Sequence, residues 1–108
     1  EIEKAAATNK RAVAQYGPQA WPLFFNPATT YAQASAKASV DPKLSAERRD
    51  ELATMYVASA IELLMEAHRT AGPKFRDDLL NELRTDTVLN PIRQRPEFVE
   101  LLKLIAPD

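Results

Sequence analysis

The sequence predicts an all-α fold of about five helices, and three features support this prediction. Apolar residues recur at spacings of three and four along most of the chain, which is the period of an amphipathic helix. No segment alternates apolar and polar residues as a half-buried strand does. The two glycines both precede prolines, in Gly17-Pro18 and Gly72-Pro73, and such pairs commonly end helices.

The length of 108 residues fits one domain with a core of its own. We divide it into an N-terminal helix with an aromatic connector (1–26), a helix pair (27–72) and C-terminal capping helices (73–108). Because the chain opens at Glu1 without a methionine, we expect it to be a fragment of a longer protein or a processed product.

Composition argues against several classes of function. The 14 basic residues are balanced by 15 acidic ones, whereas a nucleic-acid binder usually carries a basic excess to neutralise phosphates. The chain has no cysteine, which excludes disulfides and thiolate metal sites. No apolar run approaches the ~20 residues that span a bilayer, so we expect no membrane contact by this segment and a cytoplasmic location.

The first third should contain a helix and an aromatic connector. Ile2, Ala6, Val13 and Tyr16 recur at helical spacing and predict a helix from Ile2 to Tyr16. Residues 18–27 carry Trp21, Leu23, Phe24 and Phe25 among prolines. We expect Trp21 and at least one phenylalanine to pack in the core, because aromatic rings dominate core energetics. The alternative is that these rings are displayed to a partner.

The middle third predicts a helix pair. Asn26 as cap and Pro27 in the first turn should start one helix, which passes through Tyr31 and ends near Ser39. Ser45 should cap the longest helix, running to Ala71. That helix is apolar around most of its circumference, so we expect it to be the central and most buried element, with Leu64 in the core.

The last third predicts two helices and a turn. A helix from about Lys74 to Arg84 should be followed by a short turn capped by Asp86. Pro96 should open the final helix. Its apolar residues stand at i, i+3, i+4 and i+7, which are Phe98, Leu101, Leu102 and Ile105.

No residue combination points to catalysis, a cofactor or a metal. His68 is the only histidine, and Glu66 does not share its helix face. Ser45 is explained as a cap, and no second histidine could serve as its base. Asp77 and Asp78 are adjacent on a helix and point in different directions, as on a solvated face. We therefore expect a non-enzymatic domain with no metal and no cofactor.

Five residues are candidates for binding a protein or peptide partner. Tyr31, with Trp21 or Phe24, could supply apolar anchors in a groove along the helix that starts at Pro27. Arg93 and Arg95, near Arg84, could form a basic patch for an acidic peptide or a phosphate. The alternative is that these arginines pair with Asp86 or Glu97 and cover apolar surface with their stems.

Ala60, Leu64 and Ala67, followed by Gly72-Pro73, resemble the second half of a tetratricopeptide repeat (TPR). In that spacing the alanines admit a neighbouring helix and the large residue fills the gap between them. Residues 31–102 more fully resemble the degenerate TPR tail of large bacterial serine/threonine protein kinases. The segments DPKLS, YVASAIELLMEA and LRTDTVLNPIRQRPEFVELL carry this resemblance, and residues 83–102 are its most specific part.

The resemblance implies a protein-interaction or scaffold module from a larger bacterial signalling protein. The chain has no glycine-rich loop, HRD or DFG motif, so a kinase, if one is attached, would lie upstream. The alternative implied by repeat architecture is a structural cap that ends a longer helical array and binds no ligand itself.

Overall fold

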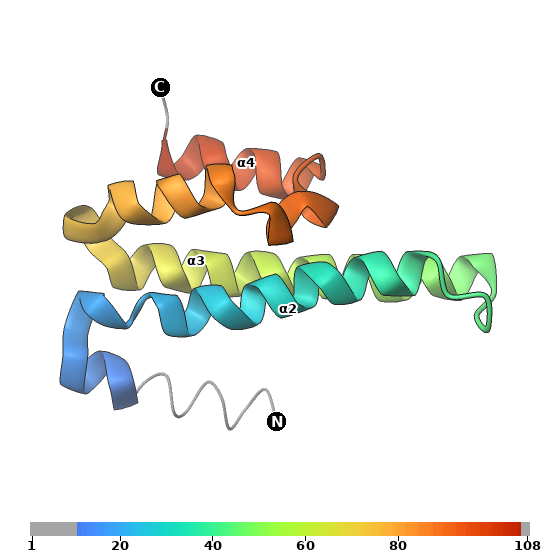
Figure 1. The fold of residues 1–108 in the computed structure, drawn as a ribbon, viewed down its shortest axis with the longest axis horizontal. Helices are drawn as coiled ribbons and strands as arrows, with labels where there is room; N and C mark the ends of the chain where they lie inside the picture. Colours follow the sequence, from blue (N-terminus) through green and yellow to red (C-terminus); the bar gives the residue numbers. More distant parts are fainter. Residues whose placement is uncertain (1–10, 107–108) are drawn as a thin grey trace.

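The computed structural model describes residues 11–106, and its fold is all-α, as predicted (Figure 1). Residues 11–16 are helical, and no strand occurs between residues 11 and 106. The elements that follow in order are η1 (Gly17–Ala20), α2 (Pro22–Ser39), α3 (Ala46–Thr85), η2 (Thr87–Ile92) and α4 (Pro96–Ile105).

Helix α2 and the first part of α3 form a long antiparallel hairpin (Figure 1). The buried residues of α3 alternate at spacings of four and three, as in a coiled-coil seam; they are Ala53, Val57, Ala60, Leu64, Ala67 and Ala71. Four of these six residues are alanines, and from Ala28 onward the buried residues of α2 are all small: Ala28, Ala32, Ser35 and Ala38. Small side chains on both helices permit the close approach that the sequence predicts. The buried hydroxyl of Ser35 donates to the carbonyl of Ala32 at 2.6 Å and so keeps a hydrogen-bond partner.

The hairpin loop and the start of α3 follow the sequence prediction. Helix α2 ends at Ser39, and the Ser45 hydroxyl accepts a hydrogen bond from the Arg48 backbone N–H at 3.1 Å. This contact satisfies one of the four unpaired N–H groups at the helix start.

Helix α3 contains a reversal of the chain at Gly72. The φ and ψ of this glycine are 58° and −166°, which are not helical. Residues 73–85 therefore form a second helical segment, which turns back along the first (Figure 1). The predicted stop at Gly72-Pro73 is confirmed. At the other glycine pair, Gly17 has φ 64° and follows the last helical residue of the N-terminal segment, Tyr16.

The predicted start of α2 is wrong. The helix begins at Pro22, and Pro27 lies inside it. Asn26 is exposed, and its backbone carbonyl accepts from the Thr29 hydroxyl at 2.6 Å instead of its side chain capping the helix. Proline is favoured in the first turn of a helix. Both Pro22 and Pro27 could take that position, and the earlier one, Pro22, opens α2. The boundary drawn between residues 26 and 27 thus falls within α2.

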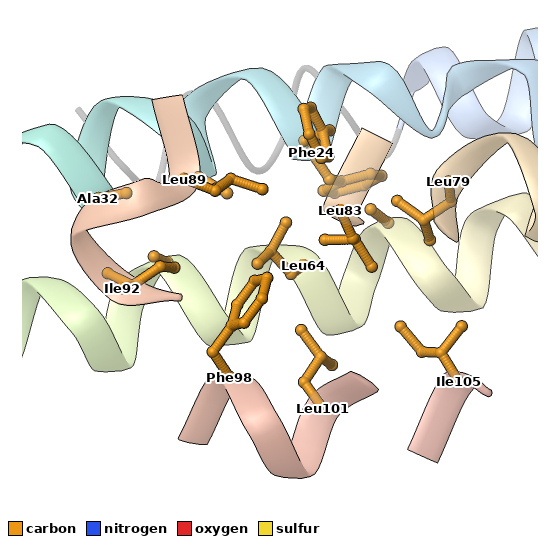
Figure 2. Close-up of a cluster of buried hydrophobic side chains, with 14 of the residues drawn as sticks. Phe24, Ala32, Leu64, Leu79, Leu83, Leu89, Ile92, Phe98, Leu101 and Ile105 are labelled. Atoms are coloured by element: carbon orange, nitrogen blue, oxygen red, sulfur yellow. The ribbon is translucent and has the colours of Figure 1, made fainter. Parts of the chain in front are cut away.

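The C-terminal third closes the core as predicted. The Asp86 carboxylate accepts from the Val88 N–H at 2.9 Å at the start of η2, and α4 begins at Pro96. Figure 2 shows side chains of η2 and α4 converging with Leu64 and Phe24. The large side chains of the C-terminal third with no more than 3% exposure come from the end of α3, from η2 and from α4; they are Leu79, Leu83, Leu89, Ile92, Phe98, Leu101 and Ile105.

The central helix is less enclosed than expected. Leu64 is fully buried, as predicted, but Met55 is 59% exposed. Ile61, Leu63 and Met65 are only partly buried against the core. Neighbours lie on two sides of the helix, α2 on one and the segment 73–85 with α4 on the other (Figure 1). Part of its apolar circumference therefore remains at the surface.

The N-terminal prediction is only partly covered by the structure. Val13 packs against the core, whereas Tyr16 is 58% exposed and does not extend the apolar stripe. Ile2 and Ala6 lie outside the described residues.

Candidate partner-binding surface

The aromatic connector is buried. Trp21, Phe24 and Phe25 retain 9%, 6% and 4% of their exposure. The rings of Trp21 and Phe25 meet edge to face, with centroids 5.7 Å apart. Of the two alternatives left open by the sequence, burial is the one observed. Trp21 and Phe24, both candidates for partner binding, are therefore core residues in this conformation.

Tyr31 is the one aromatic candidate that reaches the surface. It is half-buried on α2, and its ring lies 6.1 Å from the ring of Tyr56 on α3. Tyr31 also borders a hollow of about 450 Å³ between the two helices of the hairpin. The other lining residues come from α3 and are Ser59, Ile61, Glu62, Leu63, Met65, Glu66 and Arg69. We call this the Tyr31 hollow.

The Tyr31 hollow has apolar walls and a charged rim. Ile61, Leu63 and Met65 are the partly buried residues of the central helix. Glu66 and Arg69 form an ion pair across one helical turn. Glu62, on the preceding turn, is exposed and has no ion pair with residues 11–106. The apolar circumference of this helix in the sequence indicates these walls, although it leads us to expect the helix to be the most buried element.

Arg93 is turned toward its own chain. Its guanidinium donates to the carbonyls of Leu83 and Asp86 at 2.8 and 2.7 Å, and to the Asn90 side-chain oxygen at 3.1 Å. It also lies 5.7 Å from the centre of the Phe98 ring. The expected pairing of arginines with the Asp86 or Glu97 carboxylate does not occur here, because backbone carbonyls take its donors. Arg93 therefore stabilises the fold at the end of α3.

Arg95 has a different environment from that of Arg93. It is half-buried and lines a second hollow of about 250 Å³ together with Ser39, Ala46, Arg49, Asp50 and Ala53. Arg84 is exposed and does not border this hollow. The three arginines thus do not form a single patch, and Arg49, which the sequence did not single out, replaces Arg93 as the neighbour of Arg95.

The structure assembles no metal-ligand cluster in the part of the chain that it describes. Residues 11–106 contain no group of three or more histidine, aspartate or glutamate side chains that could hold a metal ion. His68 is half-buried, and its Nδ1 has no hydrogen-bond partner within that range. Asp77 and Asp78 are both exposed.

No helix between residues 11 and 106 is both long and apolar enough to cross a membrane. Comparison with protein-family models, with curated proteins and with solved structures gave no match.

Proposed function

We propose that this chain is a non-catalytic protein-interaction module that binds an apolar side chain of a partner in the Tyr31 hollow. The observation that carries the proposal is the hollow itself, with apolar walls from Ile61, Leu63 and Met65. Its volume of about 450 Å³ falls within the range of ~300–1,000 Å³ typical of binding pockets. Burying one large apolar side chain there would contribute roughly 1.5–3 kcal/mol.

The resemblance to degenerate TPR tails of bacterial kinases supports the same proposal. Repeats of this kind present a helix hairpin to a protein or peptide, and here α2 and α3 supply such a hairpin. On this proposal the domain acts as a scaffold in a larger bacterial signalling protein of the cytoplasm. It needs no catalytic residue, metal or cofactor.

The test is to select peptides on the wild-type domain from a random displayed library and then measure their affinity for matched variants. Met65→Ser and Tyr31→Ser should each weaken binding at least tenfold, because losing ~1.5 kcal/mol of apolar contact corresponds to about that factor. Met55→Ser and Tyr16→Ser are the controls, since both residues are exposed and neither lines the hollow.

Equal affinity of all four variants for the selected peptides would contradict the proposal. Failure to select any peptide would favour the alternative, in which the domain is the structural cap of a longer helical array. Thermal melts of each variant separate lost binding from lost folding.

A further inference from the structure

The hollow beside Arg95 brings two cationic side chains together from distant parts of the chain. Arg49 and Asp50 lie in the first turns of α3, and Arg95 immediately precedes α4. All three border a hollow of about 250 Å³, whose remaining lining residues are Ser39, Ala46 and Ala53. We call this the arginine hollow. Ala53 is 1% exposed and provides an apolar floor.

Most of the guanidinium donors in the arginine hollow are uncommitted. Arg49 uses its Nε–H on the carbonyl of Asp41, at 2.6 Å, and its two terminal nitrogens make no hydrogen bond to residues 11–106. The side chain of Arg95 makes neither a hydrogen bond nor an ion pair with any residue in that range, and only its backbone N–H and C=O are hydrogen-bonded. An arginine carries five N–H donors in a fixed fork, which matches the two oxygens of a carboxylate.

The other polar groups at the arginine hollow do not accept hydrogen bonds from these guanidinium donors. Asp50 forms no ion pair with either arginine, so no ion pair within 4.0 Å neutralises the two positive charges. The Ser39 hydroxyl donates to the Ala36 carbonyl at 2.8 Å. The start of α3 is already capped by Ser45. Two guanidinium groups and one carboxylate leave a single positive charge at the hollow.

We propose that Arg49 and Arg95 bind a carboxylate side chain in an acidic segment of a partner protein. This inference rests on the proposed function, because it names a second contact for the same kind of partner. A monoanionic carboxylate balances the single excess charge, and its two oxygens match the donor fork of a guanidinium group.

The experiment titrates the ¹⁵N-labelled domain with a capped hexaglutamate peptide and, in parallel, with inorganic phosphate. The peptide should shift the amide signals of residues 46–53 and of Arg95. Arg49→Gln and Arg95→Gln should each weaken peptide binding about fivefold, the upper end for a part-exposed ion pair. Arg76→Gln is the control, because Arg76 is exposed and does not border the hollow.

The proposal is overturned if the peptide leaves the signals of 46–53 and Arg95 unmoved, or if Arg76→Gln weakens binding as much as the other two variants. Tighter binding of phosphate than of the peptide at these residues would also overturn it. An apolar peptide that still binds the Tyr31 hollow in either case would show that only this inference, and not the proposed function, has failed.

Discussion

Arg93 connects three consecutive parts of the C-terminal third through one side chain. Its donors reach the carbonyl of Leu83 in the last turns of α3, that of Asp86 beyond it, and the side chain of Asn90 in η2. The carbonyls at a helix end lack partners within the helix. A charged donor that satisfies them contributes more than a neutral one.

Arg93→Lys should therefore destabilise the domain although the charge is kept. A lysine ammonium lacks the planar fork and cannot reach three acceptors in this geometry. We expect a loss of about 1–3 kcal/mol in the free energy of unfolding, measured by denaturant melts. Arg84→Lys, at an exposed position on the same helical segment, should change it by less than about 0.5 kcal/mol. Equal stability of the two variants would refute the role assigned to Arg93.

The helical spacing of apolar residues predicted the burial of several single residues correctly. Leu64, Phe98 and Ile105 stand at helical spacing from other apolar residues and are all buried. Arg93 and Arg95 are two residues apart and alike in chemistry, yet one points into the chain and the other borders a hollow. Arg93 contacts carbonyls at the end of α3, whereas Arg95 lies near the start of α3. Tertiary packing decides these two environments, and no local sequence pattern encodes them.

At the scale of elements, caps and glycines placed most helix ends correctly. As predicted, Ser45 caps α3, Asp86 caps η2, Pro96 opens α4, and Gly72 ends the first part of α3. The start of α2 was misplaced because Pro22 and Pro27 both suit a first turn. Burial of Trp21, Phe24 and Phe25 favours continuing the helix back to Pro22, which is a tertiary effect.

The reversal at Gly72 gives a test at this scale. A φ of 58° with a ψ of −166° is a conformation that essentially only glycine adopts. A Cβ added at this glycine would meet no atom within 4 Å, so any penalty of substitution comes from the backbone. Gly72→Ala should cost about 1–3 kcal/mol in the free energy of unfolding.

Gly72→Asn serves as the comparison for this variant. Asparagine tolerates the left-handed helical conformation but not the extended region with positive φ. We expect Gly72→Asn to be as unstable as Gly72→Ala in thermal and denaturant melts. A stability equal to that of wild type would mean that the turn does not have this backbone conformation.

At the scale of the whole molecule, the arrangement of helices decides which apolar residues become surface. The first part of α3 lies between α2 and the returning C-terminal helices (Figure 1). Its seam residues are buried, whereas Met65 and Leu63 line the Tyr31 hollow and Met55 faces solvent. The composition of α3 predicted a central helix. It could not predict which of its faces would lack a neighbour.

The most direct test of binding in the Tyr31 hollow uses the two methionines of the chain, Met55 and Met65. Both lie on α3, but only Met65 lines the hollow. Methyl-¹³C labelling of methionine gives two NMR signals, which Met55→Leu assigns. When a peptide selected on the wild-type domain is added, the Met65 signal should shift and the Met55 signal should stay in place. A shift of Met55 alone, or of neither methionine at saturating peptide, would contradict binding in the Tyr31 hollow.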